Sequence, residues 1–194
     1  MLTIDLLRHG ATQASPQHLY GATDVPLSQE GEQQLKQAWA SVSQDGISNI
    51  CTSPLQRCTW LPQHVQHQAK VVVEDAFSEM NFGAWEGQSI VDLRLKGVDL
   101  RGAMQPLLPP DGESWAVFSA RVLQAWQDYV QQHLQQGGHH LLLSHGGVMR
   151  VILAAVLHIP DAHVGKLYIP HATWSRVTCV EGEPPVLWFM NRHA

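Results

Sequence analysis

The chain of 194 residues can bury one sizeable core, and its 44% hydrophobic and 15% charged residues indicate a globular protein. The formal net charge of −5 argues against a nucleic-acid-binding surface and against electrostatic attachment to a membrane. Three cysteines are too few for a disulfide framework, and no apolar run reaches membrane-spanning length. The N-terminus lacks the pattern of a signal peptide, so we expect a cytoplasmic protein with one domain over residues 1–194.

The first part of the chain alternates short apolar runs with amphipathic stretches. Residues 2–7 are apolar without a helical period, which predicts a buried strand. Ser28 is a suitable N-cap for a helix with one apolar face. A second strand is expected over residues 47–52, followed by a helix that Ser53 would cap. Residues 71–73 predict a third strand.

An irregular segment separates these elements from the second half. Residues 78–112 are rich in glycine and proline, and we interpret them as a lid or insertion with one short helix near 89–96. From Ser114, apolar residues at three-and-four spacing predict a long helix that ends at two glycines. A strand, an apolar helix and two short strands are then expected at residues 140–144, 147–157, 176–180 and 186–190.

This alternation predicts an α/β fold, a three-layer sandwich with a mainly parallel sheet and helices on both faces. In such a sheet, ligands bind beyond the carboxyl ends of the strands. The predicted strands lead directly to Arg8 and His9, to Arg57, and to His145. Guanidinium groups and the amides of helix N-termini bind anions, and the arginine fork suits a phosphoryl group. The pattern therefore predicts a site for a small phosphorylated molecule.

Five motifs carry a resemblance to a known family. The stretch "LLRHGAT" resembles the signature of the histidine phosphatase superfamily, whose members are similar to phosphoglycerate mutases. "SPLQR" and "LLLSHGG" resemble that family's second arginine and second histidine motifs. "LYGATDVPLSQEG" and "SEMNFGAWEG" are similar to its substrate loop and its acid-bearing loop. The matches follow the family's order over roughly the whole chain, and "FGAWEG" and the modest length are more similar to its phosphatases than to its longer mutases.

The resemblance implies a role for each matching residue. His9 would be the nucleophile that forms a phosphohistidine, and Glu79 would protonate the leaving oxygen. Arg8, Arg57 and His145 would complete the catalytic set. The residues expected to bind the phosphoryl group are Arg8, Ser15, Arg57, His145 and Gly146. The arginines would neutralise the phosphate, so no metal or other cofactor is expected.

Elementary electrostatics agrees with these roles. Nearby arginines disfavour a further cation, so they should keep His9 unprotonated near neutral pH. The other ring nitrogen of His9 must be fixed by a hydrogen bond, and a backbone carbonyl near Gly10 is a candidate acceptor. A carboxylate beside bound phosphate favours its protonated form, which is the form that an acid catalyst needs.

The chain departs from the family pattern at several positions. Ala11 stands where the family commonly has Glu, and Ser15 where it often has Asn. Leu61 and Pro62 replace a usual Thr-Ala pair, and Pro62 is expected to end or kink its helix. These departures leave the phosphoryl chemistry intact and leave the substrate open.

Two alternatives involve different chemistry. Cys51 and Arg57 have the spacing of cysteine-based tyrosine phosphatases, but the intervening loop has no glycine and contains a proline, so a core role for Cys51 is favoured. Histidines could form a zinc site, although no HExxH or paired CxxC motif is present. The histidines considered are His64, His67, His139, His140 and His145.

Two further alternatives keep the family resemblance. The chain could be a catalytically inactive phosphate-binding module, which the presence of all the key residues disfavours. It could also be a phosphatase or mutase that acts on another small phosphomonoester such as phosphoglycerate. The apolar stretch "AMQPLLPP" at residues 103–110 favours a partly apolar leaving group.

Overall fold

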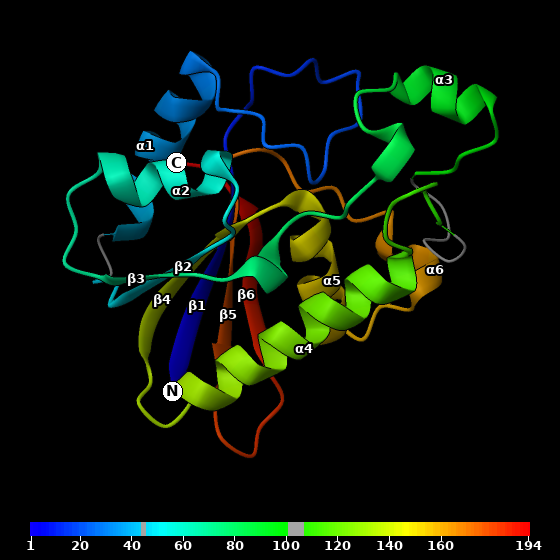
Figure 1. Cartoon of the computed structure of the whole chain (residues 1–194). Helices are drawn as coiled ribbons and strands as arrows, with labels where there is room; N and C mark the ends of the chain where they lie inside the picture. Colours follow the sequence, from blue (N-terminus) through cyan, green and yellow to red (C-terminus); the bar gives the residue numbers. More distant parts are fainter. Residues whose placement is uncertain (44–45, 101–106) are drawn as a thin grey trace.

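The computed structural model describes residues 1–43, 46–100 and 107–194. In this part of the chain six strands form one sheet in the order β3-β2-β4-β1-β5-β6 (Figure 1). The pairs β1–β4, β2–β4 and β2–β3 are parallel, whereas β5 runs antiparallel to β1 and to β6. The predicted α/β fold with a mainly parallel sheet is confirmed. The strands are β1 (Leu2–Arg8), β2 (Asn49–Thr52), β3 (Lys70–Val73), β4 (Gly138–Ser144), β5 (Trp174–Cys179) and β6 (Val186–Arg192).

Helices cover both faces of the sheet because the strands present apolar side chains to both sides. Leu141 and Leu143 pack with α1 and α2, whereas Leu142 between them packs with α4 and α5. Among the described residues no helix combines the length and apolar character needed to cross a membrane. The α-helices are α1 (Gln29–Val42), α2 (Gln56–His64), α3 (Ile90–Leu95), α4 (Trp115–His133), α5 (Gly146–Val156) and α6 (Asp161–Val164). Two short 3₁₀ helices are η2 (Asp75–Phe77) and η3 (Gly83–Trp85).

Of the two predicted caps, Ser28 is confirmed and Ser53 is not, and Ser114 caps the long helix that was expected to begin there. The Ser28 hydroxyl accepts a hydrogen bond from the amide of Gly31, and that of Ser114 accepts one from Val117. The prediction for Ser53 is wrong, because α2 begins at Gln56 and has no side-chain cap. The Ser53 hydroxyl lies 2.7 Å from the Nε2 atom of His145.

Pro62 does not end its helix, so that part of the prediction is wrong. Helix α2 continues past Pro62 and ends at His64. Proline has no backbone N–H, so α2 lacks the hydrogen bond that residue 62 would otherwise donate to the carbonyl of Cys58. The ring of His64 donates from Nδ1 to the carbonyl of Trp60 at 2.7 Å and thereby satisfies one of the terminal carbonyls.

The segment 78–112 is attached to the loop that follows β1. The Gly87 amide donates to the Leu19 carbonyl at 2.7 Å, and the Leu19 amide donates to the Gln88 carbonyl at 2.9 Å. The segment contains η3 and α3, and α3 confirms the short helix expected near residues 89–96. Residues 101–106, and with them part of the apolar stretch 103–110, lie outside the described residues. Leu107 is buried in the core, whereas Leu108 is exposed.

A buried ion-pair cluster links three strands on the face that carries α1 and α2. The carboxylate of Asp5 in β1 is fully buried and accepts hydrogen bonds from Arg176 in β5 at 2.8 and 2.9 Å. His139 in β4 donates to the same carboxylate at 2.8 Å. Burial alone would raise the pKa of Asp5, but the hydrogen bonds from Arg176 and His139 outweigh it and lower the pKa below 3.8. Asp5 therefore stays ionised inside the sheet.

Replacing Arg176 with methionine should reduce the free energy of unfolding by about 3 kcal/mol at neutral pH, because it leaves a buried carboxylate with a weaker set of partners. Because the folded pKa of Asp5 is lowered, its stabilising contribution is present above pH 3.8 and is lost as the pH falls through the lower folded value. Chemical denaturation at several pH values measures both effects. The matched control is Arg94→Met on exposed α3, for which we expect a change within about 0.5 kcal/mol. Equal losses in the two variants would contradict the assignment.

Candidate active site

Four of the predicted site residues, Arg8, His9, Arg57 and His145, meet at the carboxyl ends of the parallel strands. His9 follows β1, Arg57 lies in the first turn of α2 after β2, and His145 is the N-cap of α5 after β4. The rings of His9 and His145 pack edge to face with centroids 5.2 Å apart. Arg57 donates from Nε to the Nδ1 atom of His145 at 3.3 Å. The parallel register of β1 and β4 pairs Arg8 with Ser144, which brings the two histidine-bearing turns side by side.

His9 is held in one tautomer. Its Nδ1 atom lies 2.7 Å from the carbonyl oxygen of Gly10. A carbonyl can only accept, so Nδ1 carries the proton and Nε2 keeps its lone pair. The expected carbonyl near Gly10 is confirmed. Burial, and then the nearby His145, Arg8 and Arg57, hold the pKa of His9 well below its ordinary 6.5. His9 is therefore a neutral imidazole with an available nitrogen.

His145 is fully buried, and both of its ring nitrogens have partners. Because Arg57 donates to Nδ1, the proton of the neutral ring lies on Nε2 and is donated to the Ser53 hydroxyl. The thiol of Cys58 lies 3.7 Å from the same Nε2 atom. Burial, and then Arg57 and Arg8, hold the pKa of His145 well below 6.5. The second histidine is thus neutral and rigidly placed.

Arg57 connects this centre to the loop after β1. Its Nη1 atom donates to the Thr23 carbonyl at 2.9 Å, and Nη2 donates to the Gly21 carbonyl at 2.6 Å. Only 3% of Arg57 is exposed. A guanidinium has more N–H donors than these contacts and the one to His145 use, so Arg57 retains donors for an anion.

Arg8 is paired with a residue that the sequence reasoning missed, His171. Nη2 of Arg8 donates to Nε2 of His171 at 2.8 Å, and Nη1 donates to the Ile169 carbonyl at 2.5 Å. The His171 ring also packs against His9 with centroids 5.2 Å apart. Burial lowers the pKa of Arg8 to about 10, so the group remains cationic at neutral pH. Burial, followed by Arg8 and Arg57, lowers the pKa of His171 to about 3.

His171 escaped prediction because it precedes a strand instead of following one. Strand β5 runs antiparallel to β1, so the residues before β5 reach the edge where the parallel strands end. The sequence shows His171 just before an apolar strand. That position indicates a site residue only if the strand is known to run antiparallel to β1.

Glu79 lies beside the start of α5. Its Oε2 atom accepts a hydrogen bond from the Gly147 amide at 2.9 Å, and Oε1 accepts one from the Met80 amide at 3.1 Å. An attractive Coulomb interaction couples Glu79 to Arg8. This position puts a carboxyl group next to the cluster of histidines and arginines.

Glu86, the other acid of the same loop, has a different environment. Its carboxylate accepts hydrogen bonds from the backbone amides of Gly21, Ala22, Thr23 and Phe82. Burial alone would raise the pKa of Glu86, but these hydrogen bonds lower it. Glu86 therefore fixes the loop after β1, whereas Glu79 lies at the start of α5 next to Arg8.

The two remaining predicted phosphate-binding residues lie in different places. Gly146 is the first residue of α5, and a β-carbon there would lie 3.4 Å from the Arg8 guanidinium. Ser15 is exposed in the loop after β1, and its hydroxyl accepts a hydrogen bond from the Gln17 amide at 3.3 Å. Within the described residues, the hydrogen bonds of the Ser15 hydroxyl do not connect it to the histidine and arginine cluster.

The cysteine alternative does not fit the geometry. Cys51 is buried in β2, and burial raises the pKa of its thiol to about 12. A cysteine nucleophile needs the thiolate, which this environment suppresses. Arg57 is oriented by His145 and by carbonyls of the loop after β1.

The histidines considered for zinc have separate partners. His64 and His67 contact backbone carbonyls of α2, and His139 contacts Asp5. His140 lies 2.9 Å from the Tyr129 hydroxyl and 2.9 Å from the Asn49 amide. Over residues 1–43, 46–100 and 107–194, no group of three or more His, Cys, Asp or Glu side chains is arranged to hold a metal ion.

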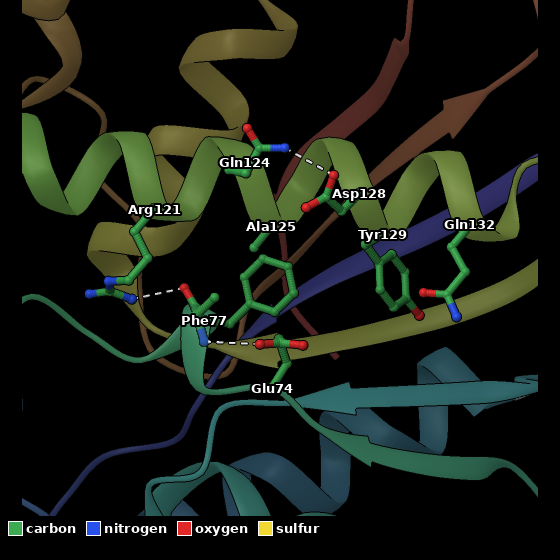
Figure 2. Close-up of a pocket in the computed structure, with 9 residues that line it drawn as sticks. Glu74, Phe77, Arg121, Gln124, Ala125, Asp128, Tyr129 and Gln132 are labelled. Atoms are coloured by element: carbon green, nitrogen blue, oxygen red, sulfur yellow. Dashed lines mark hydrogen bonds between the residues drawn. The ribbon is translucent and has the colours of Figure 1, made fainter.

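A cavity of about 340 Å³ lies apart from this cluster, between η2 and α4 (Figure 2). Arg121 borders it and donates to the carbonyls of Ala76 and Ser78. The lining includes Phe77, Tyr129 and the carboxylates of Glu74 and Asp128, and none of the histidines described above. Its side chains therefore do not contribute to the candidate active site.

Comparison with known proteins agrees with the geometry. A model of the histidine phosphatase superfamily (branch 1) matches residues 4–192. The "Probable phosphoglycerate mutase GpmB" of Escherichia coli O1:K1 is 29% identical over 199 residues, which cover 98% of this chain and 89% of the relative. The α-ribazole phosphatase of Shigella flexneri has a TM-score of 0.83 and 25% identity, covering 98% of this chain and 96% of that one. The phosphoserine phosphatase of Entamoeba histolytica, solved with 3-phosphoglyceric acid, shares the fold with a TM-score of 0.84 and 22% identity, covering 99% and 98%.

The chain belongs to the histidine phosphatase superfamily and is an enzyme that hydrolyses phosphomonoesters. The resemblance predicted from the five sequence motifs is thereby confirmed.

The contact between Glu79 and α5 makes Gly147 sensitive to substitution. A β-carbon at Gly147 would overlap the Glu79 carboxyl group, so Gly147→Ala should displace Glu79 and lower kcat/KM by roughly 10- to 100-fold. The helix itself should persist, because alanine favours helix more than glycine does. Steady-state kinetics and circular dichroism measure the two effects. The control is Gly182→Asn, in the turn between β5 and β6, where a β-carbon meets nothing within 4 Å and asparagine tolerates the positive φ of 79°. Unchanged activity in Gly147→Ala would contradict the placement of Glu79.

Proposed function

We propose that the chain hydrolyses phosphomonoesters through a phosphohistidine on His9, without a metal ion, and that its substrate is α-ribazole 5'-phosphate. The observation that carries the proposal is the tautomer of His9, whose Nε2 lone pair is left available by the Nδ1–Gly10 contact. A neutral imidazole beside two cationic guanidinium groups is the arrangement that nucleophilic attack on a phosphate dianion requires.

In the first step, Nε2 of His9 attacks phosphorus and the bond from phosphorus to the ester oxygen breaks. Glu79 in its protonated form gives its proton to the leaving oxygen, which departs as an alcohol. The guanidinium groups of Arg8 and Arg57 stabilise the charge on the transferring phosphoryl group.

In the second step, water attacks the phosphohistidine and the bond from phosphorus to Nε2 breaks. Glu79 accepts the proton of the attacking water and returns to its starting state. The products are inorganic phosphate and the free enzyme. Both steps use the same fixed positive charge, so neither requires a metal ion to neutralise the phosphate.

His145 contributes mainly through position. Because its two nitrogens are bonded to Arg57 and Ser53, direct donation to a phosphoryl oxygen requires the ring to give up one of these contacts. In the arrangement described, His145 orients Arg57 and packs against His9 without adding charge.

The assignment of the substrate is supported by the likeness to the α-ribazole phosphatase of Shigella flexneri. With this substrate, we propose that the enzyme acts in the cytoplasm, in the assembly of the cobalamin nucleotide loop. Residues 1–194 then form one phosphatase domain in which the segment 78–112 acts as the lid over the substrate. Phe82 and Trp85 anchor that segment by packing against the core.

A second candidate is a phosphatase or mutase acting on phosphoglycerate, which the 29% identity to the Escherichia coli relative favours. A mutase returns the phosphoryl group to a second hydroxyl of the substrate, whereas a phosphatase transfers it to water. Formation of 2-phosphoglycerate from 3-phosphoglycerate distinguishes the two.

A panel containing α-ribazole phosphate, 3-phosphoglycerate and phosphoserine tests the substrate assignment. We expect the highest kcat/KM for α-ribazole phosphate, unchanged activity in EDTA, and loss of activity by at least roughly 10³-fold in His9→Ala. The matched control is Cys51→Ser, which should retain activity. Loss of activity in Cys51→Ser with retention in His9→Ala would overturn the phosphohistidine mechanism.

The acid role of Glu79 predicts a dependence on the leaving group. Glu79→Gln should lower kcat by roughly 10²- to 10³-fold for an alkyl phosphate, whose alkoxide must be protonated to leave. For p-nitrophenyl phosphate, whose phenolate leaves readily, the loss in the first step should be much smaller. Trapping of the radiolabelled phosphohistidine separates the two steps. The control is Asp75→Asn, an exposed acid of η2. An equal loss for both esters in the rate of phosphohistidine formation by Glu79→Gln would exclude the acid role.

A further inference from the structure

The guanidinium group of Arg8 is held on one side by the loop that precedes β5. Nη1 donates to the carbonyl of Ile169 and Nη2 donates to Nε2 of His171. Nε of Arg8 is buried and has no hydrogen-bond partner among the described residues. Leaving a buried N–H without an acceptor costs free energy, so we interpret Nε of Arg8 as a donor that awaits an oxygen of the ligand.

The partner of Arg8 is an imidazole, and this matters for the charge of the site. A carboxylate at position 171 would bind Arg8 more strongly but would cancel the positive charge that a phosphate dianion needs. A neutral imidazole holds Nη2 of Arg8 without cancelling its positive charge. Only the neutral ring can accept a hydrogen bond at Nε2. Burial and the adjacent arginines keep His171 in that state.

We propose that His171 is a positioning residue, whose Nε2 atom holds the Arg8 guanidinium so that Nε of Arg8 faces the transferring phosphoryl group. The inference rests on the proposed function, because the phosphoryl group is the ligand that Arg8 would meet. A flexible arginine side chain loses less rotamer freedom on binding when its outer nitrogens are already fixed. His171 therefore contributes to phosphate affinity and to rate through Arg8, without touching the substrate.

Two substitutions at His171 distinguish the role of its Nε2 acceptor from the role of its ring packing against His9. His171→Phe keeps an aromatic ring beside His9 and removes the acceptor, whereas His171→Gln restores an acceptor without the ring. We expect His171→Phe to lower kcat/KM and to weaken binding of inorganic phosphate, each by about 10- to 100-fold. His171→Gln should recover to within about fivefold of the wild type. His193→Phe, at an exposed position near the C-terminus, is the control.

A double-mutant cycle with Arg8→Met tests whether His171 acts through Arg8. Once Arg8 is removed, adding His171→Phe should change kcat/KM by less than about twofold. A merely structural role would produce the same loss in both backgrounds. Thermal unfolding of each variant, followed by circular dichroism, shows whether the fold is retained, and His171→Gln decides the question if His171→Phe does not fold.

The outcomes distinguish this inference from the proposed function. Activity and phosphate affinity of His171→Phe within twofold of the wild type would overturn it, and so would additive losses in the cycle. If the wild type binds inorganic phosphate, as calorimetry measures, but hydrolyses none of the esters in the panel, the substrate assignment fails while phosphate binding by the His171 variants still tests the positioning role. A wild type that binds no phosphate would overturn both.

Discussion

The hydrogen bond between Nδ1 of His9 and the carbonyl of Gly10 is the contact on which the chemistry of this enzyme depends. It fixes the ring orientation and determines which nitrogen keeps the lone pair. Burial and the neighbouring positive groups then remove the competing proton, since both disfavour an imidazolium ion. In the proposed mechanism His9 needs no separate base, because its surroundings already keep Nε2 deprotonated.

The same principle organises the charges around His9. Each arginine is bound by backbone carbonyls and a neutral imidazole: Arg57 by the loop after β1 and His145, and Arg8 by Ile169 and His171. The acids Glu79 and Glu86 are bound by backbone amides. Positive groups are therefore fixed in place with their charge largely uncompensated by bonded acids. This local arrangement allows a chain with a formal net charge of −5 to bind a dianion.

The sequence predicted those features that follow from strand direction and periodicity. Parallel strands bring their carboxyl ends to one edge, so Arg8, His9, Arg57 and His145 were expected to meet, and they do. Local capping rules failed at Ser53, because a hydroxyl that could cap a helix is bonded to a histidine distant in the sequence. Such a competition between local and tertiary partners is not visible in a linear pattern.

Two further features lay beyond sequence reasoning for different reasons. The choice between Glu79 and Glu86 came from the family resemblance, and the structure separates the two acids by place: an amide at the start of α5 holds Glu79, and amides of the loop after β1 hold Glu86. Those amides come from segments far apart in the chain. His171 depended on the antiparallel direction of β5, which apolar periodicity does not reveal.

The reversed direction of β5 has a consequence for how this architecture can diversify. A purely parallel sheet would build its reactive edge from loops that leave strands, each tied to a crossover helix. Here a loop that enters a strand reaches the same edge and supplies Ile169 and His171. The connection between α6 and β5 can therefore vary in length and composition while the parallel strands keep their register, and new contacts to a substrate can arise there independently of the nucleophile.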